Sequence, residues 1–261
     1  MFAGIAYALP TVPQRIISAM PSITEMLYAL DLGDQIVGVT SNCNYPPQVE
    51  KKAKVGGFFL NLEKVVSLKP DLIVMLKGAQ DQDIKKFKRF GLTVYPINPD
   101  SVKGVMDSLI ELGGVTGKQA RARKVVQVMQ KRLGKIKIDF KSILKRKKVI
   151  VIVGHKPLIV AGAGTFIDGI LIYAGVDNIG AQVKGEYPQY SLEKLVNENP
   201  DCLIIPQGMI ELAKIKSDKR WRDIEAVKNN KILFIDPDTL SRPGPRVVDV
   251  VEEIAAFVHD K

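Results

Sequence analysis

The side chains that could carry chemistry in this chain favour binding over catalysis. The two histidines, His155 and His259, have no Cys, Asp or Glu at the spacing of metal ligands, so direct binding of zinc or manganese is not expected. No nucleophile is arranged with a general base and an orienting acid. Residues 162–164 read Gly-Ala-Gly, but Ile167 stands where a dinucleotide-binding fingerprint needs its third glycine. Catalysis and nucleotide binding are therefore not expected.

Two glutamates, Glu63 and Glu193, stand in a segment that the chain contains twice. Residues 61–71 read NLEKVVSLKPD and residues 191–201 read SLEKLVNENPD, at an offset of 130 residues in a chain of 261. An offset this long excludes a solenoid, whose repeats run to roughly 20–50 residues. The repetition instead predicts two similar lobes with a cleft between them.

Each copy of the repeated segment predicts the start of a helix. Asn61 and Ser191 are good N-caps, and a glutamate at the second helical position stabilises the helix dipole by about 0.3–1 kcal/mol. A Pro-Asp pair closes each copy and an apolar run follows, which indicates a sheet strand. Glu63 and Glu193 therefore have a local explanation as helix-start residues.

The first half of the chain alternates predicted strands and helices, which favours a mostly parallel sheet with helices on both faces. Ser22 and Glu25 have the spacing of a capping box at the start of the first helix. The second half repeats this order, and Thr165 with Asp168 echoes the capping box. The predicted strands are residues 15–19, 36–39, 72–76, 93–97, 149–153, 202–205 and 231–235.

A basic segment separates the two halves. Thirteen Lys and Arg and a single acid fall between residues 117 and 148, while the whole chain carries +10, so the remainder sums to −2. Charge confined to one element does not indicate a nucleic-acid-binding face. A solvated surface and contact with anionic lipid headgroups both explain this basic character. Helical spacing of the apolar residues predicts one helix over residues 118–146, with Gly134 inside it: Val126, Met129, Leu133, Ile136, Phe140 and Ile143.

The first ten residues are apolar, and residues 6–8 have the A-x-A form of a signal-peptidase site. We interpret residues 1–9 as the remnant of a signal peptide; an ordinary apolar N-terminus is the alternative. The segment is too short to span a bilayer, which takes about 20 residues, and no transmembrane segment is expected. The two cysteines, Cys43 and Cys202, are expected to be free buried thiols.

Several short motifs carry a resemblance to a known family. They are PSITE at residues 21–25, NYPP at 44–47, VGG at 55–57, NLE at 61–63 followed by KPD at 69–71, and RPGPR at 242–246. From residue 15 to residue 259 the chain resembles the substrate-binding proteins of ABC importers for corrinoids, siderophores and haem. Within that superfamily it is most similar to the periplasmic cobalamin-binding proteins.

The resemblance implies an α/β fold of two Rossmann-like lobes with mostly parallel sheets, joined by one long α-helix. It places the ligand cleft between the lobes, at the carboxyl ends of the two sheets, which agrees with the general rule for open α/β sheets. We therefore expect an N-terminal lobe over residues 10–116, a connecting helix over 117–147 and a C-terminal lobe over 148–261.

The resemblance also implies that aromatic side chains hold the ligand. Tyr45 would contact the corrin ring from the first lobe, and Tyr187 would line the cleft from the second. Two flat rings can hold a large planar ligand by apolar burial, at about 1.5–3 kcal/mol each. Phe58 and Phe59 are further candidates, although adjacent residues on a strand point to opposite faces, so at most one would reach the cleft.

Polar ligand contacts are expected from Asp238 and Arg242, on the loop after the last strand. By resemblance they hydrogen-bond the amide side chains of the corrin, and an acceptor beside a fork of donors suits amide groups. A packed loop tyrosine at Tyr45 and a surface salt bridge between Asp238 and Arg242 are the structural alternatives.

The resemblance gives Glu63 and Glu193 a second role, because one glutamate from each lobe docks on a dimeric permease in this family. We expect a soluble, monomeric periplasmic receptor with no cofactor of its own and no nucleic-acid partner, which delivers cobalamin to an ABC permease. A ferric siderophore or haem receptor is the nearest alternative. A doubly wound α/β enzyme is the alternative from another class. A cytoplasmic or membrane-associated binding module with no transport role is a third.

Overall fold

The computed structural model describes residues 12–139 and 146–259. The chain forms two compact units, Met1–Met129 with Pro243–Pro245 and Gln130–Arg242 with Arg246–Lys261, and we describe each by itself. The boundary falls within α5 (Gln119–Asp139), inside the range predicted for the connecting helix. The expected signal-peptide remnant at residues 1–9, and residues 140–145 of the predicted helix, lie outside the described residues.

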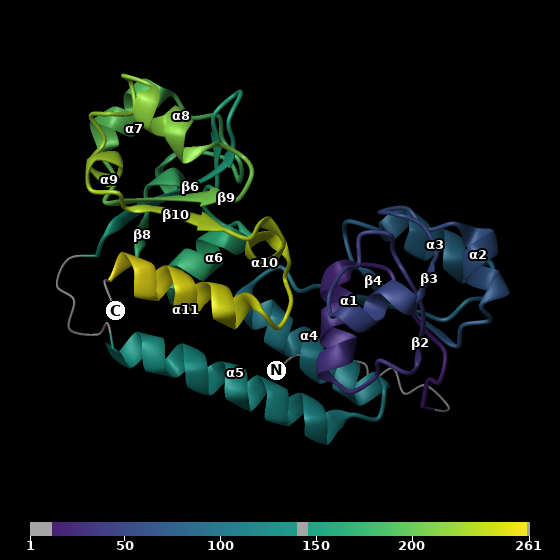
Figure 1. The fold of residues 1–261 in the computed structure, drawn as a ribbon. Coiled ribbons are helices and arrows are strands. Elements are labelled where there is room, and N and C mark those ends of the chain that lie inside the picture. The colour runs from purple at the N-terminus through teal and green to yellow at the C-terminus, as the bar shows by residue number, and fades with distance from the viewer. Residues whose placement is uncertain (1–11, 140–145, 260–261) are drawn as a thin grey trace. The chain divides into compact units, whose positions relative to one another are not determined.

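The first unit has a five-stranded sheet in which every paired strand is parallel (Figure 1). Its order is β3-β2-β1-β4-β5, so the first strand of the chain lies at the centre. The sequence predicted four of the five strands and missed the two-residue β3. The strands are β1 (Ile16–Ser18), β2 (Ile36–Val39), β3 (Ala53–Lys54), β4 (Leu72–Leu76) and β5 (Val94–Ile97).

Helices cover both faces of this sheet. On one face α2 (Leu62–Ser67) and α3 (Asp81–Arg89) pack against Ile17 and Met75, and Phe87 of α3 is fully buried there. On the opposite face α1 (Pro21–Ala29) approaches β1, where Ser18 Oγ lies 2.7 Å from Thr24 Oγ1. The helix α4 (Val102–Val115) follows β5.

The second unit repeats the plan with a mixed sheet. Strands β6 (Lys148–Gly154), β9 (Cys202–Pro206) and β10 (Ile232–Ile235) run parallel in the order β6-β9-β10, which matches β1-β4-β5 of the first unit. Two short strands complete the sheet at β6: β7 (Ile159–Val160), which is antiparallel, and β8 (Asp177–Asn178), which is parallel.

Figure 1 shows this second sheet between two groups of helices. The first group surrounds a core that contains Trp221, which is 4% exposed. That core is formed with α7 (Leu192–Glu198), α8 (Leu212–Ser217) and α9 (Glu225–Lys228). The second group consists of α6 (Phe166–Tyr173) and α11 (Val247–Val258).

The first part of the repeated segment caps a helix in both units. Asn61 Oδ1 accepts a hydrogen bond from the Lys64 N–H at 2.9 Å, and Ser191 Oγ accepts one from the Lys194 N–H at 3.0 Å. Each cap satisfies a backbone donor that the helix itself leaves unpaired. The predicted N-caps of α2 and α7 are therefore confirmed.

The second part of the repeated segment ties each helix to its sheet. Lys69 and Asn199 have left-handed φ values of 45° and 46°, and each precedes a Pro-Asp pair. The Asp71 carboxylate then accepts the N–H groups of Gln14 and Arg15 at 2.7 and 2.9 Å, just before β1. The Asp201 carboxylate accepts the Lys148 N–H at 2.7 Å, at the start of β6. The Pro-Asp pair therefore sets where the central strand of each unit begins.

The capping box predicted at Ser22 is wrong. Helix α1 begins at Pro21, so Ser22 already lies in the first turn, and the N-cap Met20 makes no side-chain cap. Proline suits the first helical position because its fixed φ matches the helix and its missing N–H would have no partner there. The equivalent prediction at Thr165 is confirmed, since Thr165 Oγ1 accepts the Asp168 N–H at 3.0 Å.

The predicted apolar stripe of the long helix α5 is buried over its described part. The residues concerned are each less than a tenth exposed: Val126, Met129, Leu133 and Ile136. In the second unit, Arg132 joins α5 to α11 through Asp249 and Glu252, with N···O distances of 2.6 and 2.9 Å. The predicted stripe residues Phe140 and Ile143 lie outside the described residues.

Candidate functional site

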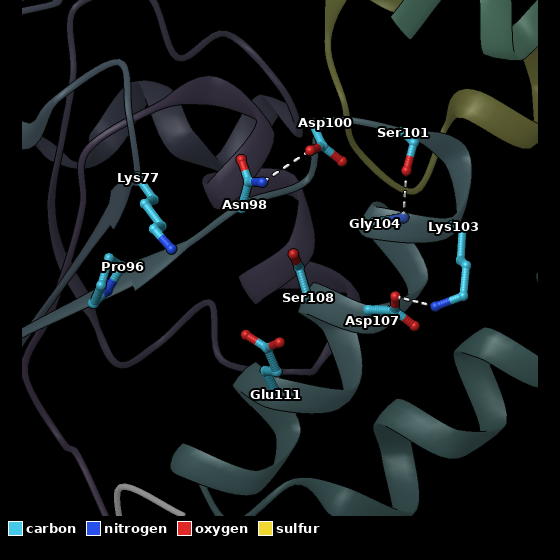
Figure 2. A pocket seen from close by; sticks show the side chains of 10 residues that line it. All are labelled: Lys77, Pro96, Asn98, Asp100, Ser101, Lys103, Gly104, Asp107, Ser108 and Glu111. Atoms are coloured by element: carbon cyan, nitrogen blue, oxygen red, sulfur yellow. Dashed lines mark hydrogen bonds and ion pairs between the residues drawn. The ribbon is translucent and has the colours of Figure 1, made fainter. Parts of the chain in front are cut away.

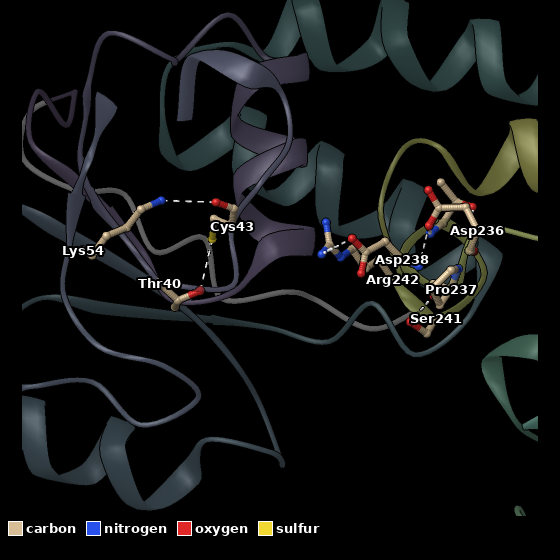
Figure 3. Close-up of polar contacts among 9 residues, drawn as sticks. Thr40, Cys43, Lys54, Asp236, Pro237, Asp238, Ser241 and Arg242 are labelled. Carbon is tan, nitrogen blue, oxygen red and sulfur yellow. Dashed lines mark hydrogen bonds and ion pairs between the residues drawn. The ribbon is translucent and has the colours of Figure 1, made fainter. Parts of the chain in front are cut away.

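Tyr45 lies in a loop whose base is held by Cys43. The sulfur of Cys43 lies 3.2 Å from Thr24 Oγ1 and 3.1 Å from Thr40 Oγ1, and Lys54 Nζ donates to the Cys43 carbonyl at 3.2 Å (Figure 3). This cysteine is buried and forms no disulfide, as expected, and the same holds for the buried Cys202. Tyr45 itself is 43% exposed, so an anchored loop presents an accessible ring.

Phe58 and Phe59 lie in a tight turn, so the alternation of side chains that a strand would give does not apply to them. A backbone bridge between Gly56 and Leu60 closes the turn. Gly56 has a φ of 133°, and a Cβ there would lie 2.5 Å from the Phe59 carbonyl oxygen, so the turn requires glycine. The two rings contact edge to face with centroids 5.1 Å apart, and they are 41% and 71% exposed. They therefore form one exposed apolar surface instead of pointing to opposite faces.

Tyr187 lies in an irregular segment beside β7 (Ile159–Val160). The Gly162 N–H donates to the Glu186 carbonyl at 2.7 Å, and the Val160 N–H donates to the Pro188 carbonyl at 3.2 Å. These bonds hold the residue on each side of Tyr187, whose ring is half exposed. Partial burial raises the pKa of Tyr187, and the Glu186 carboxylate raises that pKa further. Both effects favour the neutral phenol over the phenolate.

Asp238 lies in a short helix and Arg242 is the C-cap of that helix, which corrects the prediction that both lie in a loop. Helix α10 (Pro237–Ser241) forms here because Pro237 occupies its first position and Asp236 Oδ1 accepts the Asp238 N–H at 2.7 Å. One helical turn then brings Arg242 Nη2 to 2.7 Å from Asp238 Oδ2 (Figure 3). Arg242 is 12% exposed and Asp238 is 40% exposed. The pair offers a largely buried donor group beside an accessible acceptor.

Glu63 and Glu193 are exposed in the first turns of α2 and α7. Within the described residues, neither carboxylate forms a side-chain hydrogen bond or an ion pair. Each unit therefore presents one uncommitted carboxylate at the equivalent position of the equivalent helix.

The first unit also contains a polar pocket of about 320 Å³ that we did not expect from the sequence (Figure 2). It lies at the carboxyl ends of two neighbouring strands, because Lys77 directly follows β4 and Asn98 directly follows β5. The first turns of α4 form the remaining wall. The lining residues are Lys77, Pro96, Asn98, Asp100, Ser101, Lys103, Gly104, Asp107, Ser108 and Glu111.

The charges in this pocket are only partly paired. Lys103 forms an ion pair with Asp107, and Asn98 Nδ2 donates to Asp100 Oδ2 at 2.8 Å. Partial burial raises the pKa of Glu111, which is still an exposed side chain, and the neighbouring Asp107 carboxylate raises it further. The polar run after residue 97 was visible in the sequence, but its proximity to Lys77 follows only from the pairing of β4 with β5.

The described residues, 12–139 and 146–259, include no group of three or more His, Cys, Asp and Glu side chains that could hold a metal ion. In the same two ranges, every helix is too short or too polar to cross a bilayer. The aromatic and polar ligand candidates are divided between the two units, and the cleft expected between those units stays a prediction.

Comparison with known proteins agrees with the fold. The family described as periplasmic binding protein matches residues 16–239. An uncharacterized ABC transporter substrate-binding lipoprotein of Bacillus subtilis, YvrC, is 37% identical over 95% of this chain and 80% of its own length. A vitamin B12-binding protein of Vibrio cholerae is 28% identical over 96% of this chain and 91% of its own length.

A solved structure from Staphylococcus epidermidis has the same fold. It is described as a possible iron-binding, periplasmic solute-binding protein, and it superimposes with a TM-score of 0.84 at 31% identity. The match covers 95% of this chain and all of that one. The members of this family are solute-binding proteins and not enzymes. The chain therefore belongs to the periplasmic binding protein family, as a substrate-binding protein of the ABC-transporter type.

Proposed function

We propose that this protein captures a corrinoid such as cobalamin and delivers it to a membrane-embedded ABC permease. The relationship to a vitamin B12-binding protein along 96% of the chain is the observation that carries the proposal. The exposed aromatic rings support it, because a broad planar ligand binds through apolar contact with flat side chains. Those rings are Tyr45, Phe58 and Phe59 in the first unit and Tyr187 in the second.

The pairing of Asp238 with Arg242 favours a neutral ligand over an anionic ferric siderophore. An anionic chelate is best bound by uncompensated arginines, whereas here a carboxylate lies 2.7 Å from the guanidinium. Of the two, the carboxylate is the more exposed. The pair can instead accept from and donate to the amide groups at the edge of a corrin.

The half-exposed ring of Tyr187 suits stacking against a planar corrinoid. A tyrosine that ligates haem iron does so as a phenolate. Partial burial and the Glu186 carboxylate both raise the pKa of Tyr187, so both disfavour that phenolate. A neutral ring is suited to stacking against a planar ligand.

Glu63 and Glu193 are proposed as the docking residues. A two-fold-symmetric permease presents the same basic surface twice, so a receptor of two similar units needs one matched acidic group on each. Both carboxylates are exposed and, among the described residues, have no partner. We further propose a periplasmic location, because the relatives are periplasmic or lipoprotein receptors.

Titration with cyanocobalamin, followed by calorimetry and by the visible spectrum, tests the ligand. We expect tight binding to the wild type, and much weaker binding of haem and of a ferric siderophore. Tight binding of either iron ligand, with no cyanocobalamin binding at micromolar concentration, would refute the proposal.

Matched variants of Tyr187 separate stacking from iron ligation. Tyr187→Phe keeps the ring and should retain cyanocobalamin affinity. Tyr187→Ala removes it and should weaken binding by about tenfold or more, since burying such a ring is worth about 1.5–3 kcal/mol. Equal losses in the two variants would point to the hydroxyl, and would favour iron ligation.

A further inference from the structure

The polar pocket of the first unit contains three side chains without partners. Among the residues that the structure describes, Lys77 Nζ, Ser108 Oγ and the Glu111 carboxylate form no hydrogen bond or ion pair. Ser108 is only 2% exposed, whereas Lys77 and Glu111 are exposed side chains. Figure 2 shows the three groups directed toward the same space, one from the end of β4 and two from one face of α4. The three polar groups therefore line one pocket without satisfying one another.

The position of the pocket also fits a ligand site. Ligands of open α/β sheets bind beyond the carboxyl ends of the strands, and Lys77 and Asn98 stand directly after β4 and β5. The loop that carries Tyr45 follows β2, which is two strands from β4 and three from β5. At about 4.8 Å between neighbouring strands, the strand ends lie about 10–14 Å apart. One ligand as broad as a corrin ring can span that distance.

The chemistry of the free groups selects the kind of ligand group. Lysine only donates hydrogen bonds, an ionised glutamate only accepts them, and serine does either. The lining carries three acidic residues and two lysines, so a further carboxylate would be repelled. A neutral group with an acceptor oxygen and a donor nitrogen on the same carbon matches the hydrogen-bonding capacity of Lys77, Ser108 and Glu111.

We propose that this pocket binds a primary carboxamide side chain of the transported ligand. The amide oxygen accepts from Lys77, the amide nitrogen donates to Glu111, and the Ser108 hydroxyl completes the set. The assignment rests on the proposed corrinoid function, because the corrin edge carries such amides. It makes the pocket a specificity site that rejects ligands with carboxylates in the same place, such as haem.

A fragment titration tests the pocket without any corrinoid. Propionamide, propionate and propylamine would be added at millimolar concentration to isotope-labelled wild-type protein, and the backbone NMR signals of residues 77, 108 and 111 followed. We expect saturable shifts with propionamide only, and loss of those shifts in Glu111→Gln. Stronger shifts with propylamine or propionate, or no saturable shift with any of the three, would overturn the assignment.

A ligand swap tests the pocket at full affinity. Cyanocobalamin would be compared with its monocarboxylic acids, in which one peripheral amide is hydrolysed. The wild type should bind cyanocobalamin at least roughly tenfold more tightly than at least one of these acids. The reason is that hydrogen bonds to charged groups are worth about 1.5–3 kcal/mol. Glu111→Gln should reduce the ratio of the affinity for cyanocobalamin to the affinity for that acid, and Lys77→Met should weaken cyanocobalamin binding. The control variants Glu50→Gln and Lys85→Met change exposed side chains, and they should leave the affinity ratio and the cyanocobalamin affinity unchanged.

The two experiments fail separately. Failure of wild-type protein to bind cyanocobalamin, with selective binding of propionamide, rejects the corrinoid and keeps the carboxamide pocket. Cyanocobalamin binding that Lys77→Met and Glu111→Gln leave unaltered, with no propionamide selectivity, rejects the pocket and keeps the corrinoid.

Discussion

At the scale of single residues, the unpaired side chains separate binding groups from structural ones. Asp71 and Asp201 have the charge of Glu63 and Glu193, but their carboxylates accept backbone N–H groups and start a strand. The two glutamates make no such bond within the described residues. A carboxylate that the fold does not use is available to a partner or a ligand.

Glu111 should lower stability at neutral pH. Burial and the Asp107 carboxylate raise its folded-state pKa above the unfolded value, so the native protein binds more protons than the unfolded chain between those two pKa values. The free energy of unfolding therefore falls as pH rises through that window. Glu111→Gln should be more stable than the wild type in urea denaturation at pH 7, and the difference should shrink toward pH 4. Equal or lower stability at pH 7 would contradict this.

Single residues also show what the sequence could and could not predict. The N-caps Asn61 and Ser191 were predictable because a cap acts within three residues of itself. The presence of Lys77 and Glu111 in one pocket was not predictable, because 34 positions separate them in the sequence and only the tertiary structure places both in the lining. Features that depend on residues close in sequence, such as N-caps, were therefore predictable. Sites whose residues are distant in sequence could be found only from the tertiary structure.

At the scale of elements, most strands were predicted because each is a short apolar run bounded by turn residues. The errors fell where one residue decides between local conformations. Pro21 displaced the expected cap at Ser22, and Gly56 places Phe58 and Phe59 in a turn where strand geometry does not apply. Asp236 converted the expected loop into a short helix that contains Asp238 and has Arg242 as its C-cap. Proline, glycine and capping side chains therefore set the boundaries that hydrophobic pattern alone leaves open.

Two helical glycines should respond oppositely to alanine. A Cβ at Gly134 of α5 would have no atom within 4 Å, so Gly134→Ala should stabilise the protein by about 0.5–1 kcal/mol through helix propensity. A Cβ at Gly113 of α4 would lie 2.4 Å from the Cβ of Ala122, so Gly113→Ala should cost about 1–3 kcal/mol through overpacking. Urea denaturation measures both, and a shared sign would show that helix contacts are not the cause.

At the scale of the whole molecule, the repeated and the unrepeated residues have different uses. Both units use the repeated segment to cap a helix, to start a central strand and to present one free glutamate. The ligand candidates are not repeated: Tyr45 and the polar pocket belong to one unit, and Tyr187 with the Asp238–Arg242 pair belongs to the other. In a protein of two similar units, the repeated residues can therefore contact a symmetric partner, while the unrepeated residues contact an asymmetric ligand.

Reversing the charge of the repeated glutamates should uncouple delivery from capture. Glu63→Arg or Glu193→Arg should lower transport into permease-containing vesicles by about tenfold or more, because a like charge would face a basic docking surface. Cyanocobalamin affinity should not change, since neither residue belongs to the ligand set. Glu50→Arg and Asp223→Arg reverse exposed acids elsewhere and should leave transport intact.

The double variant decides whether the two glutamates act as a matched pair. If both units must dock together, the double reversal should lower transport little further than either single reversal, because each alone already prevents the two-point contact. Independent contacts would instead give losses that multiply. Glu63→Gln and Glu193→Gln control for the helix dipole, whose loss is worth only about 0.3–1 kcal/mol. Weaker cyanocobalamin binding in any of these variants would assign the glutamates to the ligand site and remove them from the docking surface.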